Sequence, residues 1–293
     1  MYGKNSAEST AFISRPVYLQ VLPDGTLFDR IVDPLIFCLQ ADVPYSKYYL
    51  TPWSKEYRLH YPATLLRPCP SLFSTKLEVH RDCLVELARH AGIEPHRFLK
   101  RVYNSLSSFV RWYHLGKKLL DSRKNLKVIY LTSWYFPDMM GIIAAARERN
   151  VKTVEVQHGK QGKLQAMYSG WRIPRDGYQM MPDIFWCWGT PSADHILNTS
   201  PNRHLHRPIV GGYPWIDYYR QHISRVSGSD LNQRKKHVLF TVQPPEGSNT
   251  EPIPDFLLDY LSECPRHVHF VFRCHPNDRN GPDYCHSRLS KFP

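Results

Sequence analysis

The sequence predicts an α/β protein in which short buried strands alternate with helices and form parallel sheets in two domains. Three observations lead to this prediction. Apolar runs recur along the chain, segments with helical periodicity separate several of them, and a mostly polar stretch divides the series at residues 226–236. A strand, a helix and a strand within about thirty residues form a βαβ unit, whose strands are parallel. The length of 293 residues agrees with two domains of about 150 residues each.

The clearest helix is predicted between Pro95 and about Asp121. Apolar residues recur there at spacings of three and four, so they line one helical face. These residues are Phe98, Val102, Leu106, Phe109 and Tyr113. We expect this helix to be scaffold.

The first βαβ unit follows this helix. Residues 127–133 are β-branched and aromatic and indicate a buried strand, Pro137 opens an alanine-rich helix that runs to Asn150, and residues 151–156 form the next strand.

The same alternation continues after a polar loop. We expect a strand at 183–188, a helix capped by Ser192, and a short strand at 208–210 that leads into two glycines.

The N-terminal region is less regular. Its first dozen residues are polar and are expected to be loose. The apolar runs at 17–22 and 35–39 are expected to be strands or buried turns, although prolines interrupt the region.

The domain organisation is predicted from these elements. Residues 1–225 form the first domain, 226–236 the linker, and 237–293 the start of a second domain with a strand, a helix and a strand. About 55 residues are too few for a self-supporting doubly wound sheet, so we expect the second domain to be incomplete in this chain.

The net charge and the cysteines indicate which partners and which cellular compartment to expect. A net charge of +12 attracts anions of any kind, but the Lys and Arg residues are scattered, so no nucleic acid is expected as a partner. Seven cysteines without CxxC pairs and an N-terminus without a signal peptide indicate a reducing, cytoplasmic location, at most at the inner face of the membrane. No stretch approaches about 20 apolar residues, so any membrane association is expected to be peripheral.

Residues of functional type follow four predicted strands. In open α/β sheets, ligands bind beyond the carboxyl ends of the strands. The residues at these ends are Glu155, Gln157, His158, Gly159 and Lys160 after one strand, Trp188 and Gly189 after the next, Gly211, Gly212 and Tyr213 after the third, and Arg273, His275 and Pro276 after the last.

His158 is the candidate base. Imidazole titrates near neutrality, and Gly159 leaves room for a substrate to approach the backbone, so His158 can take a proton from an attacking hydroxyl. Lys160 can neutralise an anionic group. The alternative is a histidine that is hydrogen-bonded in a tight turn. The remaining residues of this strand end and of the next two are candidates for the walls of the cleft or for binding a substrate there.

Arg273 and His275 are candidate ligands for a diphosphate or for a departing phosphate. Strand alternation puts both on one face, and Pro276 ends the strand. Gln243, which follows the strand at 237–242, is grouped with them. The alternative is a structural salt bridge and a capping histidine. Neither the GxGxxG nor the GxxxxGK[ST] phosphate motif is present, and no acidic triplet or His/Cys cluster suits a catalytic metal.

The order of these motifs resembles bacterial surface-carbohydrate and capsule biosynthesis proteins. These are similar to glycosyltransferases of the GT-B fold and, more distantly, to polysialyltransferases and CDP-glycerol glycerophosphotransferases. The resemblance covers residues 127–276 and implies two facing Rossmann-like domains, the first holding the acceptor and the second the nucleotide-activated donor. It also implies His158 as base or acceptor ligand, the segment at 273–276 on the donor phosphate, no bound metal and no cofactor besides the nucleotide sugar.

The predicted function is therefore transfer of a sugar from a nucleotide sugar to a cell-surface glycan or glycolipid acceptor. The alternatives are a polyol-phosphate transferase or nucleotide-sugar epimerase on the same fold, and a non-catalytic basic protein that binds nucleic acid. The chain departs from the family in stopping at Pro293, before the helix and the Ser- or Thr-bearing loop expected to help hold the phosphate, so this chain alone is not expected to be fully active.

Overall fold

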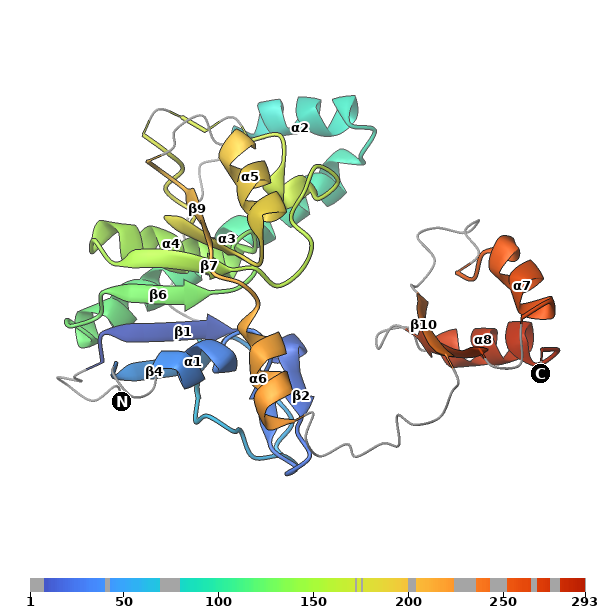
Figure 1. Cartoon of the computed structure of the whole chain (residues 1–293). Coiled ribbons are helices and arrows are strands. Elements are labelled where there is room, and N and C mark those ends of the chain that lie inside the picture. The colour runs from blue at the N-terminus through green and yellow to red at the C-terminus, as the bar shows by residue number, and fades with distance from the viewer. Residues whose placement is uncertain are drawn as a thin grey trace. The chain divides into compact units, whose positions relative to one another are not determined.

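A computed structural model describes most of the chain (Figure 1). The described residues are 8–39, 43–68, 80–171, 173–174, 176–199, 204–223, 236–242, 252–264, 268–274 and 280–292. The chain divides into two compact units, Met1–Val226 and Ser227–Pro293, and each is described by itself.

The first unit is built on a seven-stranded sheet with the order β5-β4-β1-β6-β7-β8-β9 (Figure 1). All its strand pairs are parallel. The strands are β1 (Thr10–Ser14), β4 (Tyr45–Tyr49), β5 (Thr64–Leu65), β6 (Val128–Leu131), β7 (Lys152–Val156), β8 (Ile184–Cys187) and β9 (Arg207–Val210). A small antiparallel hairpin, β2 (Leu19–Val21) and β3 (Leu27–Asp29), lies outside this sheet.

The strand order reverses between β1 and β6. The chain runs outward from β1 to β4 and β5, then returns to β6 on the other side of β1 and continues in sequence to β9. In open α/β sheets, the crevice at the carboxyl ends of the strands beside such a reversal is the preferred place for a ligand. The topology therefore directs attention to the residues that follow β1 and β6.

Helices cover both faces of the sheet. Side chains of α3, α4 and α5 belong to the core on one face, and side chains of α1 and α6 belong to the core on the other. The helices of this unit are α1 (Asp33–Leu39), α2 (Arg81–His90), α3 (Pro95–Ser122), α4 (Pro137–Glu148), α5 (Thr190–Thr199) and α6 (Pro214–His222), with short 3-10 helices η1 (Pro16–Tyr18) and η2 (Ala166–Tyr168). Strand alternation assigns the faces: Ala11 and Ile13 of β1 join the first core, and Phe12 joins the second.

The long helix α3 is fixed at its start and packs closely on α4. The Glu94 carboxylate accepts hydrogen bonds from the backbone N–H groups of His96 and Arg97 at 2.8 and 2.6 Å and so caps the helix. At Gly141 of α4 the two helices approach so closely that an added Cβ would lie 2.6 Å from the carbonyl oxygen of Phe109. This packing holds α4 and the turn that precedes it.

The second unit contains a parallel pair of strands and two helices. Its elements are β10 (Lys236–Val242), α7 (Asp255–Ser262), β11 (Val268–Cys274) and α8 (Gly281–Leu289). Val242, Ile253 and Leu257 are among its buried apolar residues. Within the described residues this sheet has two strands, as expected for the beginning of a Rossmann-like domain.

Most predicted elements are confirmed: the helix predicted from Pro95 is α3, and the strands predicted from residue 127 onward are β6 to β11. The α/β class with parallel sheets is confirmed as well.

The N-terminal expectations were wrong in two places. Residues 10–14 form β1, a fully buried central strand, and not a loose tail. The apolar run at 35–39 belongs to α1 instead of a strand or turn. A third correction concerns Ser192, which lies inside α5 because that helix begins at Thr190. A fourth concerns the segment after residue 276, where a helix was expected to be missing and α8 (Gly281–Leu289) is present.

Candidate functional site

Four polar side chains gather at the carboxyl ends of the central strands. Arg15 directly follows β1, Ser133 follows β6 by two residues, and His158 follows β7 by two residues. Tyr18, from η1, donates or accepts a hydrogen bond of 2.8 Å with the Ser133 hydroxyl. The parallel strands therefore bring residues more than a hundred positions apart to the reversal of strand order.

The His158 ring is held in one tautomer. Its Nδ1 lies 3.3 Å from the Val156 carbonyl oxygen, and because a carbonyl only accepts, Nδ1 carries the hydrogen. Nε2 then presents a lone pair. The Ser133 hydroxyl lies 3.2 Å from Nε2 and the Tyr135 hydroxyl 3.3 Å from it, so both can donate to this nitrogen.

The histidine is uncharged at neutral pH. Burial, together with the nearby positive charge of Arg15, lowers the pKa of His158 to about 4. The side chain keeps 11% of its surface exposed. A neutral imidazole that presents a lone pair in a mostly dry crevice has the form that a proton-accepting base requires.

Glu155 lies beneath the site and points to the opposite face of β7. It is fully buried, and burial raises its pKa to about 8, so the carboxyl group is protonated at neutral pH. Its Oε1 accepts hydrogen bonds from the Tyr168 hydroxyl at 2.6 Å and from the Trp134 backbone N–H at 3.4 Å. The same oxygen lies 3.8 Å from His158 Nδ1. Glu155 is therefore a buried group that hydrogen-bonds to Tyr168 and the Trp134 backbone, and it does not face an open cleft.

Arg15 closes the site on the β1 side. Its Nη2 donates to both carboxylate oxygens of Asp138, in the first turn of α4, at 2.5 and 2.7 Å. Its guanidinium carbon lies 4.4 Å from the ring centroid of Phe136. These contacts join the end of β1 to the start of α4 and keep one positive charge beside His158.

Gln157 organises the loop that carries His158. Its Nε2 donates to the Gly159 carbonyl at 2.8 Å and to the Ser192 hydroxyl at 3.2 Å, and its Oε1 accepts from the Trp188 backbone N–H at 2.6 Å. The side chain is buried. Lys160, the next charged residue, is exposed.

The ends of β8 and β9 form an aromatic wall. The rings of Trp188 and Tyr213 stack with centroids 4.2 Å apart, and the indole Nε1 of Trp186 donates to the Gly212 carbonyl at 3.0 Å. Gly211 lies directly on the Trp186 ring, where an added Cβ would be 2.0 Å from a ring carbon. Only glycine fits there. Gly189 joins β8 to α5 at the same edge.

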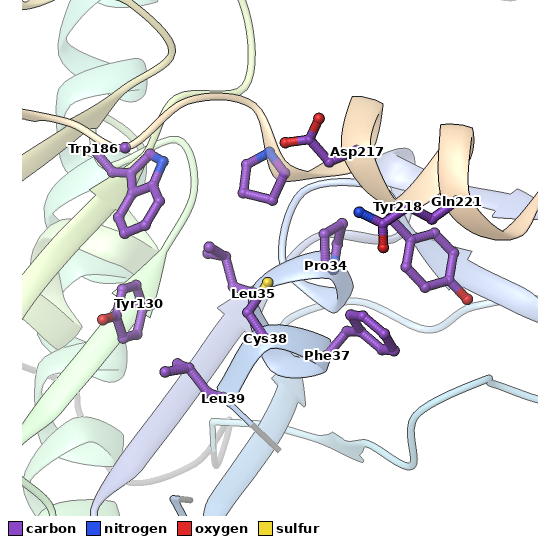
Figure 2. Close-up of a pocket in the computed structure, with 12 residues that line it drawn as sticks. Pro34, Leu35, Phe37, Cys38, Leu39, Tyr130, Trp186, Asp217, Tyr218 and Gln221 are labelled. Carbon is purple, nitrogen blue, oxygen red and sulfur yellow. The ribbon is translucent and has the colours of Figure 1, made fainter. Parts of the chain in front are cut away.

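An apolar pocket of about 290 Å³ lies between α1 and α6 (Figure 2). Tyr130 and Trp186 of the sheet form one wall, and Leu35 of α1 faces them. Asp217 and Gln221 are its polar side chains from α6. Among the described residues that line it there is no Lys, Arg or His, so this lining is not suited to a phosphate. Through Gly211 it adjoins the aromatic wall.

The predicted donor site falls largely outside the described residues. Gln243, His275 and Pro276 lie outside the residues that the structure describes. Arg273 is described: it is exposed on β11 and lies opposite Thr241 of β10. The assignment of these four residues to a donor phosphate stays a prediction, and so does the common crevice for His158 and His275.

Sequence reasoning missed Arg15, Tyr18, Ser133 and Tyr135. Ser133 could have been found, because it is the last residue of the strand predicted at 127–133 and therefore stands at a carboxyl strand end, as His158 does. Arg15 and Tyr18 could not, because β1 was not recognised.

The described residues contain no group of three or more His, Cys, Asp or Glu side chains that could hold a metal ion. Among the same residues, no helix combines the length and the apolar character needed to span a membrane.

The fold places the chain among α/β proteins of the GT-B-like class. Solved structures with this fold include UDP-GlcNAc 2-epimerase from Neisseria meningitidis bound to UDP-GlcNAc, with a TM-score of 0.51 and 13% identity over 97% of this chain and 70% of that chain. MnaA from S. aureus with UDP gives a TM-score of 0.53 and 12% identity, over 97% of this chain and 67% of that chain. A Listeria monocytogenes protein assigned as a UDP-N-acetylglucosamine 2-epimerase gives 0.52 and 11%, with the same coverage of 97% and 67%.

At these identities the likeness concerns the fold. No family model and no curated protein sequence matches the chain.

Proposed function

We propose that this chain acts on a nucleotide sugar, and that epimerisation of the sugar is the reaction its geometry supports best. The observation that carries the proposal is the neutral His158 ring, whose Nε2 lone pair faces the hydroxyls of Ser133 and Tyr135 at the reversal of strand order. The similar structures of epimerases, one of them with UDP-GlcNAc bound, support the same substrate class.

The chemistry follows from what epimerisation requires. Inversion at a carbon that carries hydrogen needs one group that removes the proton and another that returns a proton to the opposite face. His158 Nε2 is suited to remove the proton. The Tyr135 hydroxyl lies 3.3 Å from that nitrogen, on the same side of a bound sugar, so the proton returned to the opposite face would come from solvent. Tyr18 extends the hydroxyl chain through Ser133. Arg15 supplies a positive charge beside the site for an anionic part of the substrate.

Transfer of the sugar to a cell-surface glycan or glycolipid acceptor is the second candidate. The arrangement at His158 favours it, because the Ser133 hydroxyl already lies within hydrogen-bond distance of Nε2. An acceptor hydroxyl in the same position would lose its proton to that nitrogen. In that reaction Arg273, His275, Pro276 and Gln243 would hold the donor phosphate. For both reactions we propose that the nucleotide sugar is the only small molecule required. We also propose that the protein acts in the cytoplasm or peripherally at a membrane.

One experiment separates the two reactions. The full chain is incubated with UDP-GlcNAc in D₂O, with and without an oligosaccharide acceptor, and the products are analysed by NMR and mass spectrometry. Epimerisation predicts a stereoisomer that carries solvent deuterium at the inverted carbon and does not depend on acceptor. Transfer predicts a longer glycan and released UDP, without deuterium on the sugar. If other nucleotide sugars are tested as well and none reacts or binds, the proposal is wrong.

A further inference from the structure

A second, cationic pocket of about 240 Å³ lies at the amino edge of the sheet. Lys152 and Arg207 are the first residues of β7 and β9, Asp183 immediately precedes β8, and Arg147 lies in the last turn of α4 (Figure 1). His158 follows the other end of β7, so this amino-edge pocket is separate from the site described above.

Among the described residues of this pocket there is one carboxylate, Asp183, and it neutralises the cations poorly. Asp183 Oδ2 is occupied, because it accepts hydrogen bonds of 2.9 Å from both the backbone N–H and the hydroxyl of Thr153. Asp183 Oδ1 lies 3.8 Å from Arg147 Nη2 and 3.8 Å from Lys152 Nζ. Both distances are too long for hydrogen bonds. Three permanent cations against one carboxylate leave an excess of two positive charges.

Arg147 is oriented by one hydrogen bond, and its guanidinium group is not fully paired. Its Nη2 donates to the Met181 carbonyl at 2.8 Å, which orients the guanidinium group. Its Nε is buried and has no hydrogen-bond partner among the described residues. Arg207 is exposed and forms no ion pair within the described part of the chain.

A neutral histidine forms a rigid wall of the pocket. His206 is buried in a left-handed backbone conformation with φ +55°. Its Nδ1 donates to the Pro182 carbonyl at 2.6 Å, and its Nε2 accepts from the Tyr178 backbone N–H at 2.9 Å. Burial lowers the pKa of His206, so the ring adds shape without adding charge.

We propose that the amino-edge pocket binds the phosphate group of a small soluble phosphate ester. A phosphate dianion matches the excess of two charges, and its oxygens accept several charge-assisted hydrogen bonds at once. The pocket volume exceeds that of one phosphate and leaves space for the esterified group. The site needs no contribution from His158, so phosphate binding in this pocket does not depend on the reaction proposed at His158.

The test is calorimetric titration of the full chain with inorganic phosphate and with pyrophosphate at constant ionic strength. Arg207→Gln and Lys152→Gln each remove one exposed cation and are expected to weaken binding about tenfold, the effect of one charge-assisted hydrogen bond. Lys163→Gln removes an exposed lysine outside the pocket and is expected to leave affinity unchanged. His158→Gln is also expected to bind normally, which would keep this site distinct from the reaction site.

Several results would overturn the proposal. One is equal affinity of the wild type and the Arg207→Gln and Lys152→Gln variants, and another is an equal loss in the Lys163→Gln control. Competition by chloride at the same concentration would show a general counterion effect and no site. Binding to vesicles that contain phosphatidic acid, with no binding of free phosphate or pyrophosphate, would point to a membrane surface instead. Because the two glutamine variants change exposed side chains, a melting curve suffices to confirm that each is folded.

Discussion

Nε2 of His158 lies 3.2 Å from Oγ of Ser133, a residue whose backbone is held at φ +56°. Left-handed backbone costs a residue with a Cβ roughly 1–2 kcal/mol, so the fold must hold Ser133 in place through other contacts. Tyr18 supplies one of them, a hydrogen bond of 2.8 Å to the same hydroxyl. Strain of this kind at the reversal of a sheet's strand order accords with a functional role for the turn.

Ser133→Ala tests the role of that hydroxyl. The variant keeps the backbone strain but leaves the buried Tyr18 hydroxyl without its partner, so we expect a loss of about 1–3 kcal/mol in the free energy of unfolding. Activity on the nucleotide sugar should fall by about tenfold if the hydroxyl orients His158. Ser133→Gly removes the same hydroxyl and relieves the strain, so it should be the more stable of the two variants with a similar loss of activity. Equal activity of both variants and the wild type would exclude the hydroxyl from the site.

His158 should act as a base far into the acid range. Its pKa of about 4 predicts that the acid limb of kcat/KM lies near pH 4 and not near 6.5. His158→Gln should lower kcat by about 10²- to 10⁴-fold at neutral pH, the usual contribution of a positioned base. The measurement is a pH–rate profile of the reaction identified in D₂O. An acid limb near 6.5 that disappears in the glutamine variant would contradict the burial described for this ring.

The parallel sheet and its order of elements were predictable because buried strands leave a strong local signal. The run at 127–133 is apolar and β-branched on both faces, as expected for a strand covered on both sides. The strand-end rule then led correctly to His158, Trp188 and Gly211 as residues of one edge.

The half of the site that comes from β1 was not predictable in the same way. That strand reads Thr-Ala-Phe-Ile-Ser, only five residues, and it is central only because β4 and β6 add to its two sides long afterwards in the sequence. Local pattern cannot show pairing between strands so far apart. The buried position of Glu155 was also beyond reach, because charged residues are almost never fully buried and its partner Tyr168 comes from the short 3-10 helix η2, which was not predicted.

Glu155 should make stability depend on pH. Its folded pKa of about 8 lies above the ordinary value of 4.5, so the folded chain holds a proton that the unfolded chain releases. The contribution of the neutral carboxyl group is complete below pH 4.5 and is lost as the pH rises to about 8. The loss is on the order of 5 kcal/mol.

Glu155→Gln removes this titration. The free energy of unfolding of the variant should therefore rise relative to that of the wild type between pH 5 and pH 8. Urea unfolding at several pH values measures it, and Glu148→Gln, at an exposed residue of α4, serves as a control that should show little change. A difference that stays constant over this range would mean that Glu155 titrates normally.

Gly141→Ala tests the close packing that supports the turn before α4. An added Cβ would lie 2.6 Å from the Phe109 carbonyl oxygen and 2.7 Å from the Tyr113 backbone nitrogen, and backbone atoms cannot move aside cheaply. Overpacking of this kind costs about 1–3 kcal/mol, whereas the better helix propensity of alanine returns at most about 1 kcal/mol. The net result should be destabilisation in urea. Gly162→Ala meets nothing within 4 Å and should change stability by no more than about 0.5 kcal/mol. If Gly141→Ala proves as stable as that control, α3 and α4 are not in the close contact that positions Ser133 and Tyr135.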